Sequence, residues 1–189
     1  PIEWLAQQAK LDARWQLVHA THATPQEIDA VAASGAGVVI CPTTEANLGD
    51  GLPDLPRWLA SATPLSIGSD SQVGRDAMEE LRLLEFGQRL TLRQRNVAAD
   101  PQREPSTAAR LFERVLAGGG AAAGHAEWGF VEGARADLLV ADPMCEATLG
   151  VPDDSLLDAI VFAGATRPWR DVMVAGRWVL REHQHAEGA

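Results

Sequence analysis

A histidine and an aspartate each stand at the end of a short apolar run of this chain. His19 ends residues 15–19 (WQLVH), and Asp70 ends residues 64–70 (PLSIGSD). An imidazole and a carboxylate that converge can bind a divalent metal ion or a substrate. The alternative is that His19 is bonded to backbone at the end of a strand and that Asp70 lies in a turn rich in Gly and Ser. The spacing by itself leaves both interpretations open.

A polar segment lies between these two residues. Residues 43–51 (TTEANLGDG) come directly after an apolar run that ends in Cys41 and Pro42. They predict a loop, which either holds a polar substrate or is a solvated turn. Cys41 is a candidate thiol nucleophile with His19 as its base, but a small cysteine in a buried strand favours a place in the core. His22 is predicted to be a loop residue just before the Thr24 cap, and His125, His183 and His185 are predicted to face solvent.

Three short apolar runs predict buried strands, and two of the segments between them predict helices. The first connection opens with a threonine N-cap, a proline at the first helical position and a capping-box glutamate. The expected elements are strands at 15–19, 37–41 and 64–70 and helices at 24–34 and 55–62.

Strands that alternate with helices favour parallel pairing with right-handed crossovers. In such α/β folds the carboxyl ends of the strands share one rim. Ligands bind at that rim because its loops vary while the strands fix the geometry. His19 and Asp70 are therefore both expected at the rim.

The pattern changes near Ala126, where a β-rich segment follows the alternating strands and helices. Gly118-Gly119-Gly120 predicts a loop before another short helix, and Ala175-Gly176 predicts the turn of a hairpin. The expected elements are helices at 76–95 and 106–117, then strands at 137–141, 159–163 and 171–180. We therefore expect two parts, residues 1–126 and 127–189.

Charge and composition narrow the classes of function. The chain has 16 basic and 26 acidic residues, a net charge of -10, which would repel nucleic acid and anionic membranes. Two distant cysteines form no disulfide framework and favour a cytoplasmic setting. No apolar run reaches the roughly 18 residues of a membrane span. The first residue is Pro1 rather than an initiator Met, so we expect the chain to begin inside a longer protein.

Four segments carry a resemblance to a known family: LVHATH (17–22), CPTTEANLGDG (41–51), IGSDS (67–71) and EELRLLEFGQRL (79–90). In this order and spacing they resemble the last three barrel strands of the amidohydrolase superfamily. The loop after Cys41 is similar to that of the formimidoylglutamate deiminases of histidine degradation. Residues 133–143 and 171–180 resemble the returning strands of the small β-sandwich found in the superfamily. The likeness covers almost the whole chain.

The resemblance implies a metal-dependent hydrolase. Residues 1–126 would form the carboxy-terminal part of a (β/α)8 TIM barrel, and residues 127–189 part of the β-sandwich. One divalent metal, usually zinc, would be bound, with Asp70 as a ligand that also takes a proton from the attacking water. His19 would polarise or steady the hydroxide. The reaction implied is hydrolysis of the small molecule N-formimidoyl-L-glutamate to N-formyl-L-glutamate and ammonia.

The resemblance also suggests Thr44, Glu45 and Asn47 as residues lining the substrate end of the pocket. The other metal ligands of the family, a His-x-His pair and a further His, and a catalytic Glu would lie upstream of Pro1. We therefore expect the chain alone to be inactive. A homo-oligomer of the whole enzyme is an open alternative. Two rival functions remain: another deaminase of the superfamily, acting on guanine, an adenosine derivative or a triazine, and a non-catalytic binding module.

Overall fold

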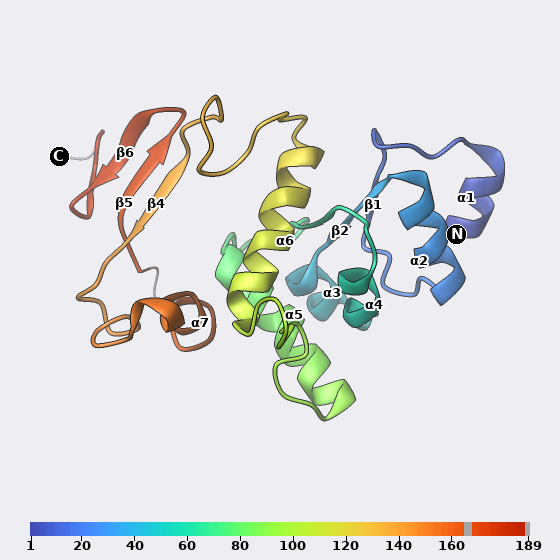
Figure 1. Cartoon of the computed structure of the whole chain (residues 1–189), viewed down its shortest axis with the longest axis horizontal. Coiled ribbons are helices and arrows are strands. Elements are labelled where there is room, and N and C mark those ends of the chain that lie inside the picture. The colour runs from blue at the N-terminus through green and yellow to red at the C-terminus, as the bar shows by residue number, and fades with distance from the viewer. Residues whose placement is uncertain (165–167, 188–189) are drawn as a thin grey trace. The chain divides into compact units, whose positions relative to one another are not determined.

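The computed structural model describes residues 1–164 and 168–187, and the chain divides into two compact units, Pro1–Gly124 and His125–Ala189. The first unit holds a parallel sheet with helices, and the second holds an antiparallel sheet (Figure 1). Within the part of the chain described, no helix is both long and apolar enough to cross a membrane.

Three parallel strands in the order β1-β2-β3 form the sheet of the first unit. The strands are β1 (Gln16–Val18), β2 (Gly37–Ile40) and β3 (Leu65–Ile67), and the connecting helices are α2 (Pro25–Ser34), α3 (Pro42–Leu48) and α4 (Leu55–Ala60). The predicted alternation of strands and helices is confirmed. Of the three strands, β2 is the central and most buried one, so the core of this unit lies around it.

The segment after Cys41 differs from the sequence-based prediction, because it contains a helix where a loop was expected. Helix α3 begins with Pro42 at its first position, where a missing N–H is harmless. It ends at Gly49, whose φ of 73° is left-handed. The turn-forming residues of this segment therefore mark the end of a helix and the loop after it.

Helix α2 has the predicted capping box. The Thr24 side chain accepts a hydrogen bond from the Glu27 N–H, and the Glu27 carboxylate accepts one from the Thr24 N–H at 2.9 Å. The Glu27 carboxylate also accepts a hydrogen bond from the Glu3 N–H in α1 (Ile2–Gln8). These backbone hydrogen bonds, from Thr24 first and then from Glu3, lower the pKa of Glu27 from 4.5 to about 2.

The stabilisation by Glu27 is expected to depend on pH. A carboxylate whose pKa is lower in the folded chain stabilises that chain fully above its unfolded pKa, and loses this effect as pH falls through the folded value. For Glu27 the window runs from about pH 4.5 down to about pH 2. Urea unfolding at several pH values should show Glu27→Gln less stable than the parent at pH 7. The difference should shrink below pH 4.5, and a gap that stays constant to pH 2 would contradict this.

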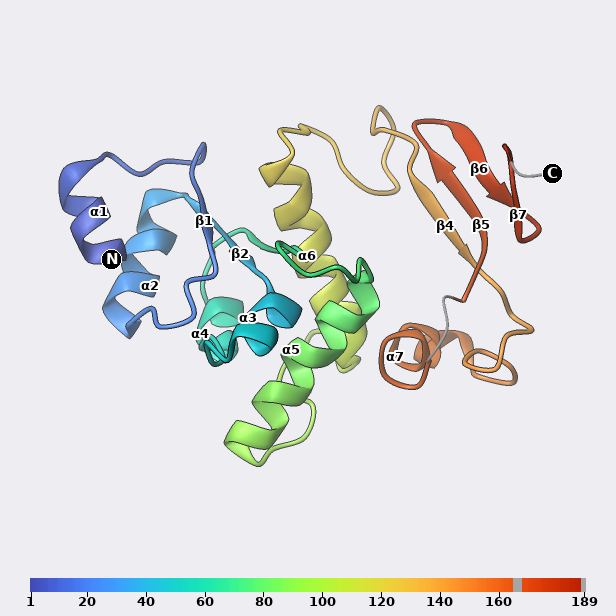
Figure 2. The ribbon, with the colours of Figure 1, turned by 180° about the vertical axis from the view of Figure 1, so that it is seen from behind.

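Two long helices complete the first unit, α5 (Ala77–Leu92) and α6 (Thr107–Ala122). They lie next to one another in both views (Figures 1 and 2). Helix α6 passes without a break through Gly118, Gly119 and Gly120, so the predicted loop there is wrong. The reason lies in packing, since Gly118 faces the backbone of Leu65 in β3 and leaves no room for a side chain.

The second unit is a four-stranded antiparallel sheet in the order β4-β5-β6-β7. Its elements are β4 (Leu138–Ala141), the 3-10 helix η1 (Asp153–Ser155), α7 (Leu156–Phe162), β5 (Trp169–Val174), β6 (Arg177–Arg181) and β7 (Gln184–His185). The hairpin around Ala175 and Gly176 is confirmed, with φ values of 49° and 77°. The strand expected at 159–163 is wrong. Residues 159–162 belong to α7, which ends at Phe162 with Ala163 as its C-cap and buries Ile160 and Val161.

Candidate functional site

His19 and Asp70 meet at the carboxyl rim of the parallel sheet. His19 follows β1 directly, and its N–H donates to the Val39 carbonyl of β2 at 2.7 Å. Asp70 comes three residues after β3. The Nε2 atom of His19 lies 3.9 Å from Oδ2 of Asp70, and the two side chains are 40% and 42% exposed. A small molecule can therefore reach both groups at once.

The backbone at these residues is unusual. His19, Ala20 and Asp70 have φ values of 70°, 51° and 46°. The left-handed region disfavours residues with a Cβ by roughly 1–2 kcal/mol each. Such strain persists where the surrounding structure holds it, and it is concentrated at functional sites. Two residues predicted to act together thus share a strained conformation at one rim.

Glu45 lies beneath the imidazole of His19. Its Oε1 accepts a hydrogen bond from the Cys41 N–H at 2.9 Å and lies 3.4 Å from Nδ1 of His19. The side chain is only 1% exposed, and its Oε2 has no hydrogen-bond partner among the residues that the structure describes. Burial raises the pKa of Glu45, and the bonds from Cys41 and His19 oppose that rise. The structure thus places Glu45 against His19 and away from solvent.

The other two candidates for substrate contact occupy different environments. The Thr44 hydroxyl is buried and donates to the Ser69 carbonyl at 2.8 Å, one residue before Asp70. Asn47 is exposed on the last turn of α3. Thr44 therefore ties α3 to the loop that carries Asp70, while the Asn47 amide is open to solvent.

Glu80, which anchors α3 from helix α5, was not predicted to have a role. Its carboxylate accepts hydrogen bonds from the Thr43 N–H at 2.9 Å and the Thr43 hydroxyl at 2.6 Å, and all three groups are buried. The one available signal was that Glu80 stands four residues before Leu84, on the apolar side of an amphipathic helix. Its partner is 37 residues away in the chain, which periodicity does not reveal.

Cys41 is the third group beside His19 and Glu45. Across the described residues, these three form the one cluster of His, Cys, Asp or Glu side chains whose ligand atoms lie close enough to hold a metal ion, within 4.8 Å of one another. Burial raises the pKa of the Cys41 thiol to about 11, with a further contribution from the negative charge of Glu45. A thiol with this pKa is protonated at neutral pH and is a poor nucleophile. A role of Cys41 in the core is thus favoured over a role as a nucleophile.

The two cysteines are expected to react very differently. Cys41 is buried and Cys145 is partly exposed. Because the thiolate is the reactive form, iodoacetamide at pH 7.5 should label Cys145 at least tenfold faster than Cys41. Peptide mass spectrometry after timed quenching measures both rates. Equal labelling rates of the two cysteines in the native chain would contradict the buried, protonated thiol, and the denatured chain, in which both thiols are exposed, is the control.

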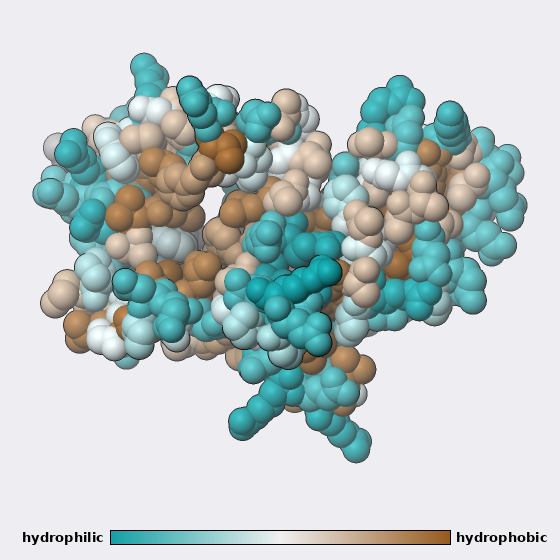
Figure 3. Space-filling model, viewed as in Figure 1, coloured by the Kyte–Doolittle hydropathy of each residue, from teal (hydrophilic) through white to brown (hydrophobic). Residues whose placement is uncertain are grey.

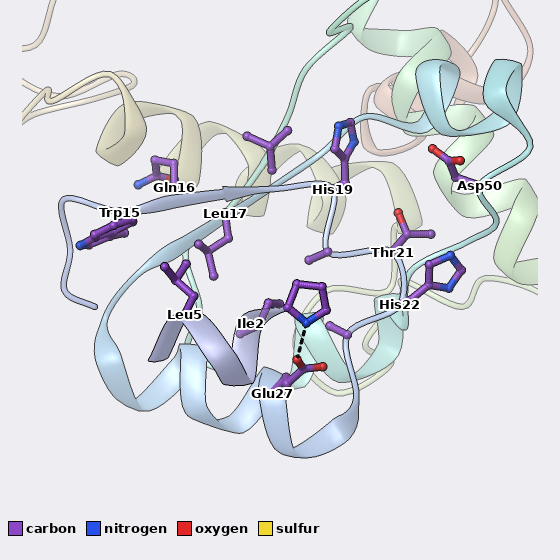
Figure 4. A pocket seen from close by; sticks show the side chains of 14 residues that line it. Ile2, Leu5, Trp15, Gln16, Leu17, His19, Thr21, His22, Glu27 and Asp50 are labelled. Carbon is purple, nitrogen blue, oxygen red and sulfur yellow. Dashed lines mark ion pairs between the residues drawn. The ribbon is translucent and has the colours of Figure 1, made fainter. Parts of the chain in front are cut away.

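A cavity of about 530 Å³ runs along β1 to His19. Ile2, Leu5 and Leu17 gather on one part of its wall, and His22 and Asp50 lie near the His19 end (Figure 4). Its lining is mainly apolar, and Gln16 and Glu27 are polar lining residues away from the His19 end. Asp70 is not among the lining residues, so this cavity opens beside the His19 and Asp70 pair and does not enclose it.

Comparison with known proteins finds several related enzymes. Residues 1–179 match the sequence profile of the amidohydrolase family. The formimidoylglutamate deiminase of Pseudomonas aeruginosa is 48% identical over 98% of this chain and 41% of that protein. The chain thus spans about two fifths of that curated relative.

Solved structures agree with this comparison. An amidohydrolase from Brucella melitensis superposes with a TM-score of 0.89 at 40% identity, over 98% of this chain and 40% of that one. An adenosine deaminase from Xanthomonas campestris with bound zinc has a TM-score of 0.83 at 23% identity, over 100% of this chain and 42% of that one. At that lower identity the likeness shows a shared fold.

Proposed function

The chain belongs to the amidohydrolase family, and from this premise we propose that it is the carboxy-terminal part of an enzyme that hydrolyses N-formimidoyl-L-glutamate to N-formyl-L-glutamate and ammonia. The observation that carries the proposal is the 48% identity to a formimidoylglutamate deiminase over 98% of the chain. The meeting of His19 and Asp70 at the sheet rim supports a hydrolytic site in this part of the enzyme.

In this proposal the first unit is the last part of a (β/α)8 barrel, and the second unit is part of a β-sandwich. Two features support an incomplete barrel. Among the described residues, strands β1 and β3 each pair with one strand only, so both outer edges of the parallel sheet have no strand partner there. Large apolar side chains also remain exposed, visible as brown areas among hydrophilic ones (Figure 3), and they include Val18 of β1. Further barrel strands would pair with these edges and cover part of this surface.

The described residues fit a zinc ion only in part. Asp70 offers a half-exposed carboxylate oxygen at the rim, which is a suitable zinc ligand. A catalytic zinc takes three protein ligands, so in this proposal Asp70 holds the ion together with residues outside this chain. When bound, zinc lowers the pKa of water to near 7 and makes hydroxide available at neutral pH.

The chemistry left to this chain is movement of protons and orientation of water. The oxygen of water bonds to the formimidoyl carbon, and the bond from that carbon to the terminal nitrogen then breaks. Asp70 takes one proton from the attacking water and passes it to the terminal nitrogen; it then takes the hydroxyl proton of the resulting adduct and passes it to the same nitrogen as the C=O bond forms, so the nitrogen departs as ammonia. His19 accepts a hydrogen bond from the water and holds it in place. Asn47 is the exposed residue of α3 proposed to contact the substrate.

A chimeric enzyme tests the proposal. The segment of the Pseudomonas aeruginosa deiminase that matches this chain would be replaced by residues 1–189, and ammonia release and zinc content would be measured. The chimera should bind about one zinc and release ammonia from formimidoylglutamate. The 189-residue chain alone should do neither, because it supplies too few ligands.

The rivals give different results in the same assay. A chimera that binds zinc but releases ammonia from an adenosine derivative, guanine or a triazine, and not from formimidoylglutamate, would overturn the proposed substrate. A chimera that folds and binds zinc but turns over none of these would favour a non-catalytic module. One tightly bound zinc in the isolated chain would overturn the proposed sharing of ligands.

A further inference from the structure

Glu45 and His19 form a contact that substrate binding does not explain. Oε1 of Glu45 lies 3.4 Å from Nδ1 of His19, at the long end of the hydrogen-bond range. Catalytic hydrogen bonds are often long before substrate is bound. The Glu45 side chain is 1% exposed while His19 is 40% exposed, so solvent and small molecules reach the imidazole and not the carboxylate behind it.

The hydrogen bond from Cys41 defines the direction of this contact. The Cys41 N–H can only donate, and it donates to Oε1 of Glu45 at 2.9 Å. An ionised carboxylate has no proton to donate, so with Glu45 ionised it is Nδ1 of a neutral His19 that carries the proton in the contact between them. In a neutral imidazole only one nitrogen is protonated, and the hydrogen bond made by one nitrogen sets the state of the other. Nε2 is then left with a lone pair.

That lone pair faces the reacting side of the site. Nε2 of His19 lies 3.9 Å from Oδ2 of Asp70. Two acceptors at this separation can share one water molecule that donates a hydrogen to each, since each hydrogen bond to water spans about 2.8 Å. The opposite tautomer would present an N–H to that water and could not accept from it. The tautomer of His19 thus decides whether the imidazole can hold the attacking water.

Glu45 is itself held firmly in place. It lies in the first half of α3, whose start is anchored through Thr43 to the buried Glu80 carboxylate of α5. Thr44, the residue just before Glu45, donates a hydrogen bond from its hydroxyl to the loop that carries Asp70. A carboxylate whose two preceding residues are held in this way can orient the ring that it touches.

We propose that Glu45 is a positioning residue, which holds His19 in the Nδ1–H tautomer with Nε2 directed at Asp70. The role given to His19 rests on the proposed hydrolytic function, whereas the tautomer is a property of the folded chain. Glu45 thus acts through His19 and does not touch substrate. The carboxylate also accepts from the Cys41 N–H at the start of α3, so a purely structural role is the alternative to exclude.

Nitrogen NMR of the ¹⁵N-labelled 189-residue chain measures the tautomer directly. His19 is assigned by loss of its signals in His19→Gln, and spectra are taken above the pH at which its shifts stop changing. The native chain should show a protonated Nδ1 and an unprotonated Nε2. Glu45→Gln keeps an acceptor oxygen and should keep this pattern. Glu45→Met replaces the carboxylate by a side chain of similar size that has no oxygen acceptor. In this variant the two His19 nitrogens should shift toward averaged values, with Nε2 mainly protonated.

Thr43→Val separates positioning from general support of α3. It removes the hydroxyl that donates to Glu80 but keeps the Thr43 N–H that donates to the same carboxylate, so the start of α3 should stay attached and the contact of Glu45 with His19 should remain. We expect it to lower the unfolding midpoint but to leave the His19 nitrogen shifts unchanged. The proposal fails if the native chain has a protonated Nε2, if Glu45→Met leaves both shifts unchanged, or if Thr43→Val shifts them as much. Should Glu45→Met not fold, the native, Glu45→Gln and Thr43→Val spectra still decide the case.

Kinetics in the chimera supply a second readout. Glu45→Met should lower kcat about 10-fold to 100-fold, the usual effect of losing a residue that orients an active-site histidine, with little change in KM. Glu45→Gln should retain most of kcat. A rise in KM with unchanged kcat would assign Glu45 to substrate binding and overturn the proposal. A chimera with no turnover would defeat the proposed function, while the NMR result would still stand.

Discussion

Replacing Gly118 by alanine is expected to destabilise the first unit by about 3 kcal/mol, at the upper end of the range for overpacking. A Cβ at Gly118 would collide with the carbonyl oxygen, carbon and nitrogen of Leu65. These atoms belong to β3, and a strand backbone cannot move aside as a flexible side chain can. Helix α6 would have to shift away from the strand that leads to Asp70.

Gly119→Ala is the matched control. The same substitution one residue later meets no atom within 4 Å, and alanine is favoured over glycine inside a helix by about 1 kcal/mol. Gly119→Ala should therefore be neutral or stabilising. Urea unfolding followed by circular dichroism compares the two variants with the parent. Similar stability of Gly118→Ala and Gly119→Ala would show that α6 does not lie directly against β3.

These glycines explain one limit of sequence-based prediction. Three consecutive glycines have low helix propensity, so a loop was the expected structure. Tertiary packing reverses that preference, because only glycine lets α6 approach the backbone of Leu65. The error at 159–163 has a related cause. A short apolar run suits a strand or a buried helix, and its own residues do not distinguish the two.

One part of the candidate site was predictable from the order of the strands and helices, and another part was not. Alternating strands and helices imply parallel pairing, and parallel pairing places residues that follow β1 and β3 on one rim. The expected convergence of His19 and Asp70 agrees with their separation of 3.9 Å. The burial of Glu45 was not predictable, because it depends on α3 forming and on a contact with His19, 26 residues away. Long-range contacts of polar side chains leave no periodic signal in a sequence.

In the chimeric enzyme, Asp70→Asn should lower kcat/KM for formimidoylglutamate by at least about 100-fold, the lower end of the range for a lost general acid or base. Asparagine cannot take up the proton of the attacking water, and it is a weaker zinc ligand than a carboxylate, so zinc content should also fall. The choice of asparagine matters because Asp70 has a φ of 46°. Asparagine tolerates this left-handed conformation, whereas alanine would add strain to the loss of the carboxylate.

Asp29→Asn is the control for this prediction. It makes the same chemical change at an exposed aspartate of α2 that pairs with Arg57 and is not among the residues that line the cavity beside His19. Its kcat/KM should stay within a factor of two of the parent chimera. The decisive comparison is of variants with the same unfolding midpoint, since equal stability separates lost chemistry from lost folding. If Asp70→Asn retains both zinc and turnover, the carboxylate is neither a ligand nor a proton carrier, and the strained φ at this position would need another cause.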